Sequence, residues 1–207
     1  MFKESITPKE LEKIDFATCP GKIIVIDSVG AEFNRAIAYL REQKVIGFDT
    51  ETRPTFSPDQ PRYSVSLLQL SGPDKSFLFR INKIGMHRRL CNLLSSPKVI
   101  KVGAAIHDDI RGLQKHRDFV PAGFVDLQKI VWEWGIRDKA VKKMAAIILG
   151  IRISKTQQLS NWEAEKLSES QCKYAATDAW VCREMYMKLQ SEPKNPLIEE
   201  VVPKEAE

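Results

Sequence analysis

The chain has 207 residues, of which 43% are hydrophobic, so its length and composition suit one globular domain with a substantial core. Its formal net charge of +5 is modest. The longest apolar run, from Met144 to Ile151, is far shorter than the roughly 20 residues of a transmembrane helix, so we expect no contact with a membrane. No segment has the pattern of a signal peptide, and we expect a cytoplasmic protein.

Hydrophobic periodicity and turn residues predict alternating helices and strands in the first half of the chain. A capping box at Thr7 and Glu10, with Pro8 at the first helical position, predicts a short N-terminal helix. The elements expected next are a strand at 22–26, a helix at 31–42, a strand at 45–51, a loop at 52–63, a strand hairpin at 65–70 and 76–79, a helix at 84–94 and a strand at 98–102.

The second half is predicted to be mainly helical. The expected helices begin just after Gly103, at Leu127 (to Trp134), at Lys139 (to Leu149) and at Ser168, where a capping box with Gln171 opens a helix that ends near Leu189. Residues 150–162 are polar and irregular. Strands that alternate with helices predict an α/β fold in which helices flank a mixed sheet.

Two carboxylates, Asp49 and Glu51, end the predicted central strand 45–51. In a strand, a spacing of two residues places both side chains on one face, roughly 7 Å apart along the backbone. Two acids held together at the end of a buried strand repel each other and lose solvation, so a proton or a cation must compensate. Taken alone, a pair with this spacing is more often the end of a strand that simply runs out into a polar loop.

Two further acidic sites follow in the sequence. Asp108 and Asp109 lie where a strand gives way to a helix, and hence at the edge of the sheet. Tyr174 and Asp178 are four residues apart on the last helix, which places them on one helical face. Each site also has an ordinary structural interpretation as a helix cap, a solvated charge or a packed aromatic ring. We expect Asp109 to face inward with Leu113 and expect Asp108 to cap the helix.

Basic residues are concentrated between Arg137 and Lys155, a segment with six basic residues and one acid. Such a segment can steer a polyanion toward the protein, although a solvated basic helix face gives the same pattern. The candidates for contacts with backbone phosphates are Lys142, Lys143, Arg152 and Lys155.

The order FDTE (48–51), VGAAIHDD (102–109) and YAATD (174–178) resembles the three motifs of the DEDDy 3′-5′ exonucleases. That family includes ribonuclease D and the exonuclease domain of the Werner syndrome helicase. The resemblance implies a ribonuclease H-like fold. It also implies three parts of the chain: an N-terminal helical extension at 1–20, the exonuclease domain at 21–190 and a loosely ordered tail at 191–207.

The resemblance further implies two-metal hydrolysis of phosphodiester bonds at the 3′ end of DNA or RNA, single-stranded or recessed, which releases nucleoside 5′-monophosphates. Two divalent cations, Mg²⁺ or Mn²⁺, are the expected cofactors. The metal ligands implied are Asp49, Glu51, Asp109 and Asp178, and Tyr174 is the residue that would orient the attacking water. The alternatives are a non-catalytic nucleic-acid-binding module on the same fold and an endonuclease of the ribonuclease H type.

Overall fold

A six-stranded mixed sheet forms the centre of the computed structural model, which describes residues 1–57, 59–60 and 62–197. The strands are β1 (Lys22–Ile26), β2 (Val45–Thr52), β3 (Val65–Ser71), β4 (Lys75–Phe79), β5 (Ile100–Gly103) and β6 (Phe124–Asp126). Their order across the sheet is β1-β4-β3-β2-β5-β6. The strand β3 is antiparallel to both of its neighbours, and the other neighbouring pairs are parallel. The expected mixed sheet is therefore confirmed.

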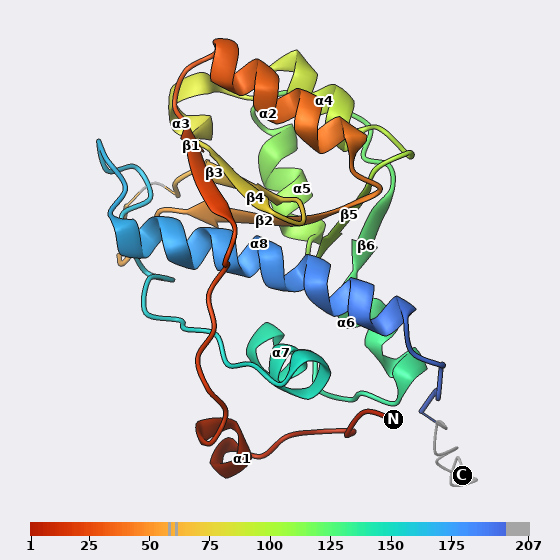
Figure 1. Ribbon diagram of the computed structural model, residues 1–207. Coiled ribbons are helices and arrows are strands. Elements are labelled where there is room, and N and C mark those ends of the chain that lie inside the picture. Colours follow the sequence, from red (N-terminus) through yellow and green to blue (C-terminus); the bar gives the residue numbers. More distant parts are fainter. Residues whose placement is uncertain (58, 61, 198–207) are drawn as a thin grey trace, which may run out of the picture.

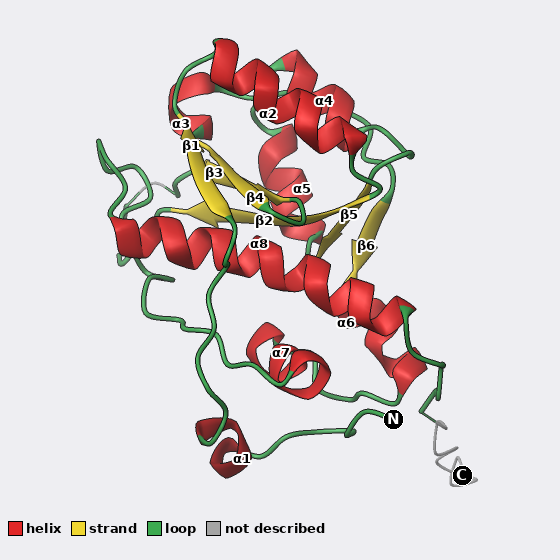
Figure 2. Cartoon of the chain, viewed as in Figure 1, coloured by secondary structure: helices red, strands yellow, loops and turns green. Residues whose placement is uncertain are grey.

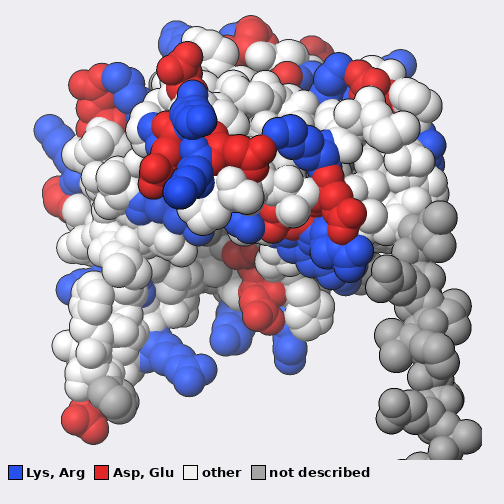
Figure 3. All heavy atoms as spheres, turned by 90° about the horizontal axis from the view of Figure 1, so that it is seen from below, with Lys and Arg blue, Asp and Glu red and all other residues white. Residues whose placement is uncertain are grey.

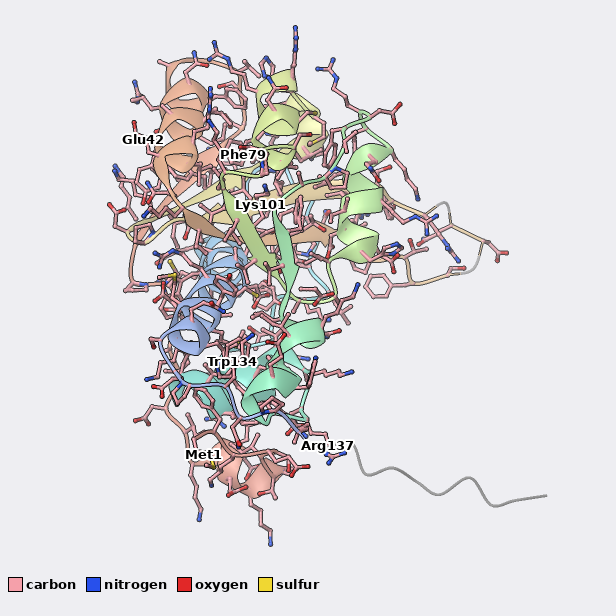
Figure 4. The ribbon with its side chains drawn as sticks, turned by 90° about the vertical axis from the view of Figure 1, so that its right-hand side faces the viewer. Met1, Glu42, Phe79, Lys101, Trp134 and Arg137 are labelled. Atoms are coloured by element: carbon pink, nitrogen blue, oxygen red, sulfur yellow. The ribbon has the colours of Figure 1, made fainter. Side chains whose placement is uncertain are left out.

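Helices cover both faces of this sheet (Figures 1 and 2). They are α1 (Pro8–Glu12), α2 (Ala31–Glu42), α3 (Ile81–Ile84), α4 (Arg88–Leu94), α5 (His107–Gln114), α6 (Leu127–Ile130), the 3₁₀ helix η1 (Val131–Trp134), α7 (Val141–Leu149) and α8 (Glu169–Gln190). The helices α2 and α4 lie on one side of the sheet and the long helix α8 on the other, with α7 and α1 beyond α8; the side view in Figure 4 shows the same layers.

The apolar positions of each helix explain these layers. In α2, the expected inward residues Phe33, Ile37 and Leu40 are all buried, since spacings of three and four residues place them on one face. They pack with the sheet into one core, and α8 closes smaller cores on the opposite face. None of the helices in the described ranges is long and apolar enough to cross a membrane.

Glycines with a positive φ interrupt or end two of the expected helices. The predicted helix 84–94 is wrong in its first turn: Gly85 adopts a left-handed φ of 63° and separates α3 from α4. The predicted helix 127–134 is one turn of α helix followed by η1, and it ends at Gly135, whose φ is 79°. The expected end at Trp134 is therefore confirmed, whereas the hydrophobic pattern runs through Gly85 and did not indicate the break there.

The edge strand β6 was missed by the sequence analysis. It has only three residues, Phe124–Asp126, which is too short for a recognisable alternation of apolar and polar side chains. It forms because Val125 pairs in register with Val102 of β5. The pairing with β5, and not a pattern within residues 124–126, therefore makes this segment a strand.

The two ends of the chain lie against α7 and η1. The helix α1 packs through Leu11 against Ala146 of α7. Residues 192–197 run along η1, where the backbone N–H groups of Asn195 and Leu197 donate to the carbonyls of Glu133 and Trp132. The rest of the expected tail, 198–207, lies outside the described residues, and the division of the chain into three parts stays a prediction.

Candidate active site

The strand β2 presents Asp49 and Glu51 to the face of the sheet that α8 covers. Gly47 shares that face, because alternate residues of a strand point the same way. A Cβ atom on Gly47 would lie 1.8 Å from the carbonyl oxygen of Ala179, so the helix backbone contacts the strand directly at this glycine. Directly after Glu51 the register of β2 against β3 shifts at a β-bulge. The two carboxylates therefore lie between the site where β2 contacts α8 and the site where its regular pairing with β3 ends.

The helix α8 brings Asp178 to the same place. The helix begins with the expected capping box of Ser168 and Gln171. Carboxylate oxygens of Asp49, Glu51 and Asp178 all lie within 4.8 Å of one another. Two segments about 130 residues apart in the sequence thus form one acidic cluster, as the motifs predicted.

Burial and mutual repulsion raise the pKa values of these carboxyls. Glu51 is only 9% exposed, and loss of solvation, followed by the charges of Asp49 and Asp178, raises its pKa to about 10. Burial, with the charges of Asp178 and Asp109, also raises the pKa of Asp49 well above its ordinary value. For Asp178, burial raises the pKa to about 7, although the Tyr174 hydroxyl and the Lys155 ammonium act in the opposite direction. At neutral pH the cluster therefore favours a bound proton or a bound cation.

The helix α5 places Asp109 next to this cluster but outside it. The Thr50 hydroxyl donates a hydrogen bond of 2.5 Å to an Asp109 carboxylate oxygen. Desolvation raises the pKa of Asp109, and this hydrogen bond acts against the shift. Because the charge of Asp109 contributes to the raised pKa of Asp49, the two carboxylates are electrostatically coupled. Asp109 is thus close to the other acids while its side chain is held by Thr50.

The neighbouring Asp108 does not have the expected capping role. The helix α5 begins at His107 with Ile106 as its N-cap, so Asp108 lies inside the first turn. The Asp108 side chain is 95% exposed and its carboxylate lies 3.3 Å from Nδ1 of His107. The expectation that Asp108 caps the helix was wrong by two residues, because the helix begins at His107 and its N-cap is Ile106.

Tyr174 stands one helical turn before Asp178 and is hydrogen-bonded to it. Burial, with the charges of Asp178 and Glu51, raises the pKa of the Tyr174 phenol well above its ordinary value, so the hydroxyl stays protonated. The centroid of its ring lies 6.0 Å from that of the fully buried Trp162. Arg80 holds the segment after Trp162 in place, since its guanidinium donates a 2.6 Å hydrogen bond to the Ala164 carbonyl.

A pocket of about 340 Å³ opens over the acidic cluster and Tyr174. Two of the four predicted basic residues, Lys142 and Lys155, line it. Lys143 instead forms a 2.8 Å ion pair with Asp138, and the Arg152 guanidinium lies 3.9 Å from the ring centroid of Phe16. Figure 3 shows one face of the molecule, on which basic and acidic side chains are interspersed.

Several residues of the pocket were missed by the sequence analysis. Gln128 and Gln158 contribute amide groups to its wall. Ala105, also in the wall, has a φ of 58°, a left-handed conformation that is rare for a residue with a side chain. The Asp126 carboxylate accepts 3.0 Å hydrogen bonds from the backbone N–H groups of Ala105 and Gln128 and so fixes this turn. No short-range pattern relates these positions, because separate strands and loops bring them together.

The donor set of the cluster fits a hard divalent cation. Carboxylate oxygens are the ligands that Mg²⁺ and Mn²⁺ prefer, and three of them converge here. Among the described residues, the positive charge that lowers the pKa of Asp178 is that of Lys155, and one ammonium cannot neutralise three acids. A divalent cation would supply the missing positive charge.

Comparison with known proteins places this site in a family. Residues 25–194 match a family model described as a 3′-5′ exonuclease domain. Mouse exonuclease 3′-5′ domain-containing protein 2 is 27% identical over 186 residues, which cover 82% of this chain and 28% of that protein. Ribonuclease D of Gluconacetobacter diazotrophicus is 28% identical over 169 residues, which cover 80% of this chain and 42% of that protein.

A solved structure shows the same fold. The exonuclease domain of Aedes aegypti Nibbler superposes with a TM-score of 0.73 at 23% identity, covering 84% of this chain and 91% of that domain. The expected ribonuclease H-like fold is thereby confirmed. The chain spans well under half the length of the two curated relatives above. The match over residues 25–194, with the predicted motifs meeting in one pocket, shows that the chain belongs to the DEDDy family of 3′-5′ exonucleases.

Proposed function

We propose that this protein removes nucleotides one at a time from the 3′ end of a nucleic-acid strand and releases nucleoside 5′-monophosphates. The observation that carries the proposal is that Tyr174 and Asp178 of α8 meet Asp49 and Glu51 of β2 in one open pocket. An enzyme that attacks a strand end needs such an accessible pocket with acids at its base. Membership of the 3′-5′ exonuclease family supports the same activity.

In this proposal the carboxylates hold two divalent cations, Mg²⁺ or Mn²⁺. Asp49, Glu51 and Asp178 would together hold one ion, and Asp109 would help to hold the other. When bound, such ions activate a water molecule and stabilise the charge that develops on the scissile phosphate and the leaving oxygen. The chain's own contribution is to hold three carboxylates together in a pocket that a strand end can enter, with Asp109 beside them.

Tyr174 would act on the attacking water. Its phenol remains protonated at neutral pH because burial raises its pKa. A protonated hydroxyl beside Asp178 can hydrogen-bond a water molecule and orient it without binding a metal itself. Trp162 fixes the ring of Tyr174 from one side, which limits the directions in which the hydroxyl can point.

Lys142 and Lys155 are the residues we propose for contacts with backbone phosphates, since both line the pocket. Phosphate contacts position a strand without reading its sequence, so they serve DNA and RNA equally. Single-stranded and recessed 3′ ends are the proposed substrates. The cytoplasmic location expected from the sequence stays a prediction.

The test is a digestion of 5′-labelled single strands and recessed duplexes, of DNA and of RNA, with Mn²⁺, with Mg²⁺ and with a chelator. A ladder of products shortened from the 3′ end, metal-dependent and absent in Asp49→Asn, is the expected result. Release of nucleoside 5′-monophosphates should accompany the ladder.

Two other results would each indicate a different function for this protein. Internal cuts in a circular strand would indicate an endonuclease of the ribonuclease H type. Retarded migration of the strands without any cleavage, under both metals, would indicate a non-catalytic nucleic-acid-binding module.

A further inference from the structure

Gln69 of β3 is a buried polar residue that the motifs of the family do not account for. Its side chain is 0% exposed, and both its amide oxygen and its amide nitrogen lack a hydrogen-bond partner within the described residues. An unpaired buried amide is unfavourable, because it has lost its hydrogen bonds to water and gained none in the protein. Leucine or methionine would fill this position in the sheet without that penalty. The amide therefore requires an explanation beyond packing.

The register of the sheet places Gln69 beside the acidic cluster. Gln69 on β3 is the direct cross-strand partner of Asp49 on β2. Side chains of directly paired residues lie on the same face of a sheet, with their Cβ atoms about 4.5–5.5 Å apart. The Ser71 hydroxyl, two residues further along β3 and hence on the same face, donates to the Ala176 carbonyl of α8. Gln69 thus lies under α8 and beside Asp49 on the same face of the sheet.

The other direct cross-strand partner of Gln69 and the residues around that partner are apolar. Its partner on the opposite side is Leu78 of β4. Leu67, two residues earlier on β3, packs with Leu78 and with the small residues Ala175 and Ala176 of α8. The side chains of these four residues carry no hydrogen-bonding group. Of the two residues paired directly with Gln69, Asp49 and Leu78, Asp49 is the one with a polar side chain.

We propose that Gln69 is a positioning residue for the metal site: its amide nitrogen donates a hydrogen bond to the Asp49 carboxylate when the cations are bound. This inference rests on the proposed function, because it assigns Asp49 as a metal ligand. A hydrogen-bond donor behind a ligating carboxylate fixes the orientation of its oxygens. The carboxylate then loses less conformational freedom when a metal binds. Gln69 would then direct the lone pairs of Asp49 toward the cations without touching them.

The test is Mn²⁺ binding, measured by calorimetry on the folded protein, together with the thermal midpoint of the metal-free protein. Gln69→Met keeps the length and shape of the side chain but removes the donor. We expect its Mn²⁺ affinity to fall about tenfold or more, which is the usual effect of losing a hydrogen-bond partner of a metal ligand. Its thermal midpoint should be unchanged or higher, because an unpaired amide has left the core.

Ser71→Ala is the matched control on the same strand and the same face. Its hydroxyl is buried and bonded to Ser76 and Ala176, and its cross-strand partner is Gly47 and not a carboxylate. We expect this variant to lose thermal stability and to bind Mn²⁺ like the wild type. Gln69→Leu provides a second apolar variant in case Gln69→Met does not fold.

The outcomes separate this inference from the proposed function. If Gln69→Met or Gln69→Leu binds Mn²⁺ within twofold of the wild type, Gln69 does not position Asp49, even if the wild type degrades 3′ ends. If the variants lose Mn²⁺ affinity while the wild type cleaves no strand, the positioning role stands and the proposed activity fails. An equal loss of Mn²⁺ affinity in Ser71→Ala would assign the effect to general disturbance of the sheet and would overturn the inference.

Discussion

The absence of a side chain at Gly47 is what allows the carbonyl of Ala179 to approach β2. A Cβ atom on Gly47 would lie 1.8 Å from that oxygen and 2.6 Å from its carbon, both backbone atoms that cannot turn aside. Asp178 precedes Ala179 on α8, and Asp49 follows Gly47 by two residues on the same face of β2. The distance between the two carboxylates is therefore set by the contact between helix and strand backbones.

The first prediction is that Gly47→Ala destabilises the protein by about 3 kcal/mol or more, at or above the upper end of ordinary overpacking, because the helix must move. Displacement of α8 should also weaken Mn²⁺ binding. Gly30→Ala is the control, since no atom of the described residues lies within 4 Å of a Cβ atom built at that position. Chemical denaturation of both variants measures the difference. A Gly47→Ala protein as stable as Gly30→Ala would contradict the close contact.

The second prediction concerns the pH dependence of the metal-free protein. In the folded state the pKa of Glu51 rises from its ordinary value of 4.5 to about 10. The stability that its proton confers is therefore complete below about pH 4.5 and is lost as the pH rises toward 10, because the unfolded chain releases the proton first. Burial shifts the pKa of Asp178 in the same direction, to about 7.

Glu51→Gln tests this relation, since the amide stays neutral at every pH. At pH 8 the metal-free variant should melt at least about 2 °C above the wild type, which corresponds to roughly 1 kcal/mol in a protein of this size. Its Mn²⁺ binding should be lost. Thermal melts between pH 5 and pH 9 give the slopes. The prediction is contradicted if the wild type melts at the same temperature at pH 9 and at pH 5 and if Glu51→Gln melts no higher than the wild type at pH 8. Ionisation of Glu51 would then not destabilise the folded protein.

The third prediction separates the roles of Tyr174 and Asp178. Tyr174→Phe keeps the ring against Trp162 and should bind Mn²⁺ like the wild type, yet lose about 100-fold in rate, a typical contribution of a group that orients a reacting water. Asp178→Asn should lose Mn²⁺ affinity as well. Calorimetry and single-turnover rates provide the two measurements. Equal Mn²⁺ affinity in Asp178→Asn and the wild type would disprove its assignment as a ligand.

The fourth prediction concerns the basic residues. The double variant Lys142→Ala/Lys155→Ala should weaken binding of single strands and reduce the slope of log affinity against log salt by about 0.7 for each lost phosphate contact. Lys143→Ala is the control, because its ammonium pairs with Asp138 and does not line the pocket. Binding is measured by anisotropy in Ca²⁺ over a range of salt. If Lys143→Ala reduces the slope as much per lysine as the double variant does, the strand does not bind preferentially along the pocket.

The fifth prediction compares the adjacent acids of α5. Asp109→Ala should lower the rate about 100-fold or more, since a metal ion contributes several kcal/mol to the transition state. Asp108→Ala should change the stability by less than about 0.5 kcal/mol, because the Asp108 side chain is 95% exposed and lies inside the first turn of α5 instead of at its N-cap. Rates and thermal melts of both variants decide. The reverse pattern would mean that Asp108 and not Asp109 faces the metals.

The sequence by itself determined the elements and the chemistry that depend on local spacing. Asp49 and Glu51 share a face because a strand repeats every two residues, and Tyr174 and Asp178 because a helix repeats every 3.6. The capping box at Ser168 and the apolar face of α2 were readable for the same reason. The resemblance of three sequence motifs to the family's pattern, and not local spacing alone, named the four carboxylates and the tyrosine as site residues.

Only the tertiary structure decided which residues meet. The pairing of Val125 with Val102 made β6 a strand, and the backbone contact at Gly47 set the distance between Asp49 and Asp178. The tertiary structure also brought Lys142 and Lys155 into the wall of the pocket that Asp178 lines. These relationships join residues that no short-range pattern connects, because they depend on the register of strands and the packing of helices that close only when the whole chain folds.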